Sequence, residues 1–435
     1  MNLLPKHSYL IHAACLTGAI ALTASVGVLG SGLNLKAYAE LQDSPKTIVD
    51  EAWQIVNREY VDGTFNKQNW LAVRQSLLSR NYTSREQAYV AIREALERLE
   101  DPYTRFMDPK QFQVLTSQTS GELSGIGVRL EVDEQTKTLT VVEPIENSPA
   151  IRAGLRTGDR ILEIDGKSTK GMSVDEASNL IRGEVGTKIT LRIVRDGSGD
   201  MSVPLTRARI ELPTVRYSMK QEGALKVGYI RLSEFSSHAG DQMRKAIQEL
   251  TNQQADAFVL DLRGNPGGLL QASIEISRMW MDNGAIVRTV DREGHDEEAT
   301  ANQSALTKLP LVVLVDNNSA SSSEILTGAL KDNGRAVVVG SQTFGKALVQ
   351  SVHALSDGSG LAVTIAHYYT PKGTDISQKG ITPDVKVDLT EAQMQYLATN
   401  PKLVATPEDP QYTRAVNVLQ KMALNKPPFN QSARP

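Results

Sequence analysis

Two short stretches of the chain carry residue types that could perform nucleophilic chemistry. The first, residues 318–325, is a serine-rich turn that follows an apolar run and precedes a helical pattern. The second, residues 343–350, holds a single lysine, Lys346, among apolar and glycine residues. A serine hydroxyl is a poor nucleophile until a base removes its proton. Together the two stretches predict a serine nucleophile, Ser321, with Lys346 as its base.

A lysine can act as a base only when its amine is neutral. Its ordinary pKa of about 10.4 must fall by roughly three units, which costs about 4 kcal/mol. Burial among Phe344, Ala347 and Leu348 would supply that shift. Ser321 lies where an apolar strand turns toward a helix, and backbone N–H groups at a helix start suit the oxyanion of a tetrahedral intermediate. The structural alternative is that Ser321 and Glu324 form only a capping box.

A second motif overlaps the lysine stretch. Residues 340–346 fit the spacing G-x-x-x-x-G-K of a phosphate-binding loop. Ala347 stands where that loop needs Ser or Thr for magnesium, and the residues after it favour a strand over a helix. Nucleotide binding is therefore disfavoured. The histidines are scattered without metal-binding spacing.

Size, charge and cysteine content limit the remaining function classes. With 435 residues, the chain is too long for one ordinary domain. A net charge of −3 argues against nucleic acid as a partner, because phosphate neutralisation needs a basic surface. The single cysteine, Cys15, lies near the N-terminus, so the rest of the chain offers no thiol chemistry. We expect no cofactor and no metal.

Residues 1–39 are predicted to be a signal peptide. An apolar run over residues 13–29 follows Lys6, and Ala37-Tyr38-Ala39 has the small-x-small pattern of a cleavage site after Ala39. The run approaches the length that spans a bilayer, so an uncleaved anchor is the alternative. Both forms predict export, and peripheral membrane association stays open.

The remaining chain predicts an α+β multidomain protein. Residues 40–118 are expected to be helical and structural, with Ser44 capping the first helix and Ser84 with Gln87 boxing a later one. Residues 119–207 hold short strands and two short helices. Residues 208–390 alternate strands with helices, which is typical of an α/β domain with largely parallel pairing. Residues 391–435 form a tail with one amphipathic helix.

Two known families resemble this organisation. Residues 148–161 resemble a PDZ domain, in the runs SPA, AGL and GDRI. The whole of residues 45–390 resembles the carboxyl-terminal processing peptidases, or tail-specific proteases, in three motifs: residues 318–325, residues 343–350, and DLRGNPGG at 261–268. That resemblance implies a serine–lysine endopeptidase with a crotonase/ClpP-like α/β catalytic core behind a PDZ domain.

The resemblance to that family assigns roles to single residues. Ser321 would be the nucleophile and Lys346 its base, while Gln350 would orient Lys346 through a hydrogen bond. Positions 346 and 350 share one face of a strand, which agrees with that role. The N–H groups of Gly267 and Ser322 would stabilise the oxyanion. Three positions depart from the family pattern: Ser322 for alanine, Ala347 for glycine and Gly264 for asparagine.

The PDZ resemblance predicts how a substrate is recognised. Gly125-Ile126-Gly127-Val128 matches the loop whose consecutive N–H groups bind a peptide's terminal carboxylate. The structural alternative is a plain hairpin turn. The expected partners are proteins or peptides with exposed C-termini, and the alternative function is a non-catalytic PDZ-type binder of such tails.

The substrate and the compartment stay open at this stage. Photosynthetic members of the family trim a photosystem II core subunit, and the chain is compatible with such a member. The sequence does not separate that role from general tail proteolysis, in a periplasm or a thylakoid lumen. It does not indicate an oligomeric state or whether the PDZ domain gates activity.

Overall fold

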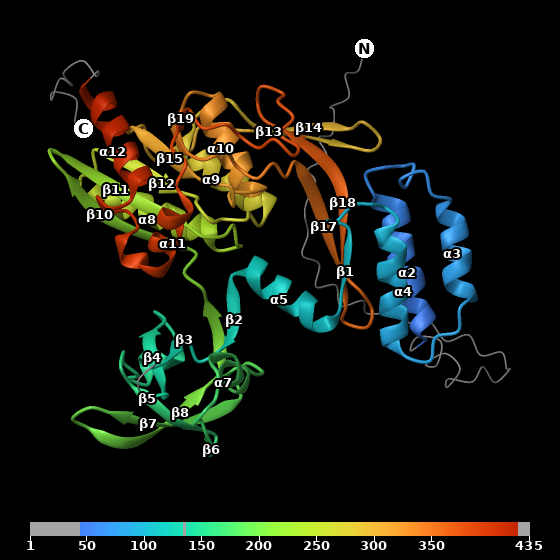
Figure 1. Ribbon diagram of the computed structural model, residues 1–435, viewed down its shortest axis with the longest axis horizontal. Coiled ribbons are helices and arrows are strands. Elements are labelled where there is room, and N and C mark those ends of the chain that lie inside the picture. The colour runs from blue at the N-terminus through green and yellow to red at the C-terminus, as the bar shows by residue number, and fades with distance from the viewer. Residues whose placement is uncertain (1–43, 134–135, 425–435) are drawn as a thin grey trace, which may run out of the picture.

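The N-terminal helices share their core with a strand from the far end of the chain. The computed structural model describes residues 44–133 and 136–424, so the predicted signal peptide and Cys15 lie outside it. The helices are α2 (Pro45–Glu59), α3 (Trp70–Ser79) and α4 (Arg85–Glu97). Buried side chains of all three pack with Leu361 and Val363 of β18 (Gly360–Tyr369). Figure 1 shows this bundle against the long β17–β18 hairpin.

The predicted caps of these helices are only partly right. The Ser44 hydroxyl accepts a hydrogen bond at the start of α2, as expected. The Ser84 hydroxyl accepts one from the N–H of Gln87 at 3.4 Å. The Gln87 side chain, however, binds the N–H of Thr83 at 2.9 Å, so the expected reciprocal box is wrong.

A short strand, β1 (Arg105–Met107), joins the helical region to strand β18. The residues of β1 pair antiparallel with 360–362 of β18. The next helix, α5 (Pro109–Ser120), connects β1 to the region formed by residues 122–211 (Figure 1). Residues 44–118 are therefore joined to the core by both backbone pairing and a common apolar cluster.

Residues 122–211 form the PDZ region, which follows the predicted order of elements. Its buried apolar cluster lies within residues 126–205. The last strand pairs with the first, and so extends this region beyond residue 207. Its elements are β2 (Glu122–Gly125), β3 (Val128–Val132), β4 (Leu139–Pro144), α6 (Pro149–Arg152), β5 (Arg160–Ile164), β6 (Lys167–Ser168), α7 (Val174–Ile181), β7 (Lys188–Arg195), β8 (Gly199–Thr206) and β9 (Ala208–Glu211).

The α/β core is built on a six-stranded sheet of order β10-β11-β12-β15-β16-β19. All neighbours from β11 onward are parallel, which confirms the predicted pairing. The strands are β10 (Val215–Glu222), β11 (Leu225–Leu232), β12 (Ala257–Asp261), β15 (Leu311–Val315), β16 (Val337–Gly340) and β19 (Val385–Lys386). One face packs on α8 (Ala239–Asn252), α9 (Leu270–Trp280) and α10 (Ser322–Asp332).

The other face of this sheet is covered by the C-terminal segment. Helix α12 (Pro410–Leu424) packs there and begins five residues before the predicted start at Ala415. It follows α11 (Glu391–Thr399) and the turn η1 (Pro401–Leu403). No helix within residues 44–133 and 136–424 is long and apolar enough to cross a membrane.

A second, antiparallel sheet flanks the core. Its order is β1-β18-β13-β14, and β17 pairs with β18. The strands not yet bounded are β13 (Ala285–Asp291), β14 (Asp296–Thr300) and β17 (Leu348–Ala354). Because β17 directly follows the lysine stretch, no helix is present to receive a phosphate there, as expected.

Candidate active site

Ser321 occupies a strained turn at the start of α10. Its backbone has φ 53° and ψ −114°, a region that residues other than glycine rarely adopt. Strained backbone of this kind is concentrated at functional sites, where the surrounding structure holds it. The turn follows β15, so Ser321 lies at the carboxyl edge of the parallel sheet, where ligands bind in open α/β sheets.

A buried carboxylate joins this turn to the lysine stretch. One oxygen of Glu324 accepts hydrogen bonds from the Thr343 hydroxyl (2.6 Å) and the Gly345 N–H (2.7 Å). The other accepts from the N–H groups of Ser321 (3.0 Å) and Lys346 (2.9 Å). Burial raises the pKa of Glu324, although these hydrogen bonds oppose the rise. The sequence indicated only a helix cap here, whereas the carboxylate holds the main chains of Ser321 and Lys346 at a fixed spacing.

The surroundings of Lys346 lower the pKa of its amine. Burial lowers its pKa, and the positive charge of Arg105 acts in the same direction. The carboxylates of Asp101 and Glu324 oppose the shift but do not outweigh it. The expected desolvation of Lys346 is present, and the charge of Arg105, from the N-terminal region, adds to its effect.

The Lys346 amine is not hydrogen-bonded to the described residues that are predicted to be its partners. Among the described residues, the Lys346 amine makes no hydrogen bond to Ser321 or Gln350, and the Gln350 side-chain nitrogen is buried without a partner. The β17–β18 register shifts between Val349 and Gln350. The expectation that Lys346 and Gln350 share one face of a strand is therefore wrong. Lys346 precedes β17, and the register shift interrupts the alternation of side chains before Gln350. Catalytic hydrogen bonds often tighten only in the substrate complex.

The two predicted oxyanion donors, Gly267 and Ser322, lie next to Ser321, the predicted nucleophile. At Gly267, where φ is 107°, an added Cβ would lie 2.9 Å from the Ser321 Cβ and 3.1 Å from the Ser322 nitrogen. Only glycine allows this approach. Ser322 begins α10, whose first N–H groups have no partner within the helix. The Gly267 N–H donates to the Asn265 side chain at 2.9 Å, so it must turn away from Asn265 to reach an oxyanion.

The predicted carboxylate loop lines a groove in the PDZ region. Gly125, Ile126, Gly127 and Val128 border a small cavity of about 80 Å³ between β3 and α7. At Gly127, with φ 79°, an added Cβ would lie 2.3 Å from the Ser148 Cβ. The loop therefore requires glycine here, because its backbone packs closely against Ser148.

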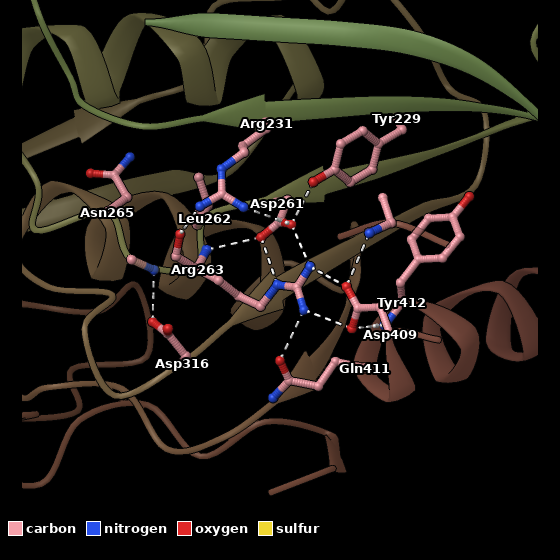
Figure 2. Close-up of polar contacts among 12 residues, drawn as sticks. Tyr229, Arg231, Asp261, Leu262, Arg263, Asn265, Asp316, Asp409, Gln411 and Tyr412 are labelled. Carbon is pink, nitrogen blue, oxygen red and sulfur yellow. Dashed lines mark hydrogen bonds and ion pairs between the residues drawn. The ribbon is translucent and has the colours of Figure 1, made fainter. Parts of the chain in front are cut away.

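A network of buried charges lies at the end of β12, directly before the loop that contains Gly267 (Figure 2). The Arg263 guanidinium donates to Asp261 at 2.9 and 2.6 Å and to Asp409 at 3.0 and 2.8 Å. It also donates to Gln411 at 3.1 Å, and the Tyr229 hydroxyl donates to Asp261 at 2.7 Å. Burial alone would raise the pKa of Asp261, but the charge and hydrogen bonds of Arg263 outweigh it and lower the pKa. The network fastens the start of α12 to the end of β12.

A cavity of about 1040 Å³ opens beside this network. It is bordered by the carboxyl ends of the parallel strands and by α11. Gly264 and Asn318, which precede Gly267 and Ser321 in their loops, line it. Gly267, Ser321 and Lys346 are not among its lining residues, so this cavity neighbours the candidate site in sequence without containing it.

A second serine lies beside a histidine, but the geometry is wrong for a triad. The Ser351 hydroxyl is 2.9 Å from Nε2 of His353, and a Glu59 oxygen is 2.6 Å from the same nitrogen. A Ser–His–acid triad uses the two ring nitrogens separately. His238 is paired with Glu122 at 3.0 Å. These contacts agree with the expected structural role of the histidines.

Comparison with known proteins identifies the family. Residues 226–387 match "Peptidase family S41", and residues 140–195 match "PDZ domain". A carboxyl-terminal-processing protease of Synechocystis is 43% identical over 393 residues, which cover 90% of each chain. The chain belongs to peptidase family S41. Its enzyme class is therefore carboxyl-terminal processing peptidase, as the motifs predicted.

Two further relatives extend this similarity. The chloroplastic carboxyl-terminal-processing peptidase 2 of Arabidopsis thaliana is 41% identical over 346 residues, covering 77% of this chain and 67% of that one. A solved structure described as a photosystem II D1 C-terminal processing protease is 36% identical, with a TM-score of 0.53. It covers 85% of this chain and 99% of that chain. The S41 fold and the PDZ region are therefore shared with processing peptidases.

The shared carboxylate of Glu324 leads to a first prediction. In Glu324→Gln, one oxygen becomes an amide that cannot accept, so two buried donors lose their partner at about 1–3 kcal/mol each. We expect the free energy of unfolding in urea to fall by about 2 kcal/mol or more, and kcat/KM to fall more than about tenfold as the two loops separate. Glu97→Gln, on the exposed face of α4, is the matched control. Equal stability and activity of the two variants would contradict the proposed spacing role.

Proposed function

We propose that the protein is an exported serine endopeptidase that cleaves C-terminal tails of protein substrates, with Ser321 as nucleophile and Lys346 as general base. The observation that carries this proposal is the junction at Ser321. An added Cβ at Gly267 would lie 2.9 Å from the Cβ of the strained Ser321. The Glu324 carboxylate accepts hydrogen bonds from the main chains of both Ser321 and Lys346. Three predicted motifs thus meet at the turn that carries Ser321.

The reaction follows from these positions. The Ser321 hydroxyl attacks the scissile carbonyl while the neutral Lys346 amine takes its proton. The N–H groups of Gly267 and Ser322 stabilise the oxyanion, and the protonated lysine then gives its proton to the leaving amine. Water hydrolyses the acyl-enzyme, with Lys346 again accepting a proton. Gln350 orients the amine once Lys346 turns toward Ser321.

The PDZ region supplies selection for tails. The loop from Gly125 to Val128 binds the terminal carboxylate, and the peptide adds as a strand beside β3. The upstream chain then extends to Ser321. The name of the solved relative makes the precursor of the photosystem II D1 subunit one candidate substrate. The predicted signal peptide and the cyanobacterial and chloroplastic relatives support a periplasmic or lumenal location.

A matched pair of peptides tests this function. One ends in a free carboxylate and the other, of the same sequence, ends in an amide. Mass spectrometry after incubation with the protein should show internal cleavage of the free tail, at a kcat/KM at least about tenfold above that of the amide, because a charged partner is lost. A free tail that binds but stays intact would support the alternative, a non-catalytic PDZ-type binder. Comparing trimmed C-termini in cells with and without the protein would identify the physiological substrate.

A further inference from the structure

The loop that follows α4 is fixed against the catalytic strand hairpin. The Asp101 carboxylate accepts hydrogen bonds from the Tyr103 N–H (2.9 Å) and from the hydroxyls of Thr104 and Thr364 (both 2.7 Å). The Thr104 hydroxyl accepts in turn from the Thr364 N–H at 3.0 Å. Thr104 and Thr364 are 3% and 1% exposed. Because Thr364 belongs to β18, this network sets where Tyr103 stands relative to the core.

Tyr103 contacts the base itself. Its ring centroid lies 4.6 Å from the Lys346 amine, within the range of a cation–π contact. No hydrogen bond to the amine competes with the ring among the described residues. The charged groups that act on the amine are Asp101, Arg105 and Glu324. The Tyr368 hydroxyl binds the main-chain oxygen of Lys346 and leaves the amine to the ring.

We propose that Tyr103 is a positioning residue for the base, and that its ring face holds the protonated Lys346 amine before substrate binds. The proposal rests on the proposed role of Lys346. An aromatic face attracts the ammonium form and not the neutral amine. The contact therefore opposes deprotonation and keeps the amine away from Ser321. A region expected to be only structural thus takes part in controlling the base.

Removing the ring while keeping apolar bulk isolates this effect. In Tyr103→Leu the ammonium loses its aromatic partner, so the pKa of Lys346 should fall by about half a unit. The acidic limb of kcat/KM against pH, which reports the free enzyme, should move down by the same amount. One pH unit below the wild-type midpoint, the variant should retain about threefold more of its own plateau activity. Tyr103→Phe keeps the ring and should keep the wild-type midpoint.

A second readout does not depend on catalysis. In the Ser321→Ala background, the rate at which acetic anhydride labels Lys346, followed by mass spectrometry against pH, gives the pKa of the amine directly. The same downward shift is expected for Tyr103→Leu and for Tyr103→Met, which serves if the leucine variant folds poorly. A merely structural tyrosine would lower activity at all pH values without moving either midpoint.

The outcomes separate the two proposals. An unmoved or raised labelling midpoint in the leucine and methionine variants would overturn the role of Tyr103, as would a Phe variant that shifts as far as Leu. If the labelling midpoint moves as expected but the wild-type protein cleaves no tail, the positioning contact stands and the proposed function fails.

Discussion

Ser321→Ala and Lys346→Ala are each expected to lower kcat/KM for a tailed peptide by at least about 10⁴-fold, because nucleophile and base act as one unit. For the same reason, the double variant should be no worse than either single variant. Lys346→Arg should be equally inactive, since a guanidinium stays protonated in proteins. Mass spectrometry of single-turnover reactions measures these losses.

The pH dependence of cleavage provides a second check on the base. Because burial lowers the pKa of Lys346, the neutral amine exists at lower pH than in a free lysine. Activity should therefore rise with pH through a pKa that lies below that of a free lysine. Lys372→Ala, an exposed lysine of the same domain, is the control and should leave activity within about twofold. Retention of a tenth of the activity in Lys346→Ala would remove Lys346 as the base.

Arg263→Met is expected to cost about 3–5 kcal/mol of stability, because it leaves buried carboxylates without their cation. Asp261 and Asp409 are both fully buried, and Arg263 bridges them. The pKa of Asp261 is lowered in the native protein, so this stabilisation is present above its unfolded pKa and is lost as the pH falls through the folded one. The deficit of the variant should shrink in acid, where the Asp261 carboxylate can bind a proton.

Urea unfolding with limited proteolysis measures this loss. We expect the segment 391–424 to become cleavable first, since Asp409 anchors it to the end of β12. Arg231→Met is the matched control, because the Arg231 side chain is 38% exposed and its ion pair with Asp261 is long, at 3.7 Å. That change should cost less than about 1 kcal/mol. Arg263→Met with the stability of Arg231→Met would show that the network is not needed to hold α12.

The regular elements were predictable where local pattern decides them. The alternation of strands and helices in the core and the cap of α2 at Ser44 follow from nearest neighbours in sequence. The helical region was predicted as a unit of its own. Its pairing through β1 depends on a partner more than 250 residues away, which periodicity cannot reveal.

The site was predictable in its members but not in its contacts. Ser321, Lys346, Gly267 and Ser322 come from motifs, and the structure brings their loops together. The role of Glu324 was obscured because a helix cap and a bridge between loops require the same residue. Tyr103 gave no signal as a partner of Lys346, since a cation–π contact between distant segments leaves no spacing to detect.

The pairing of β1 with β18 has a consequence for the order of events during synthesis. A polypeptide grows from its N-terminus, so β1 is made long before residues 360–362 exist to pair with it. Until that partner emerges, the hairpin that shapes the lysine loop is incomplete. A nascent fragment that ends before residue 362 therefore lacks part of the framework around Lys346.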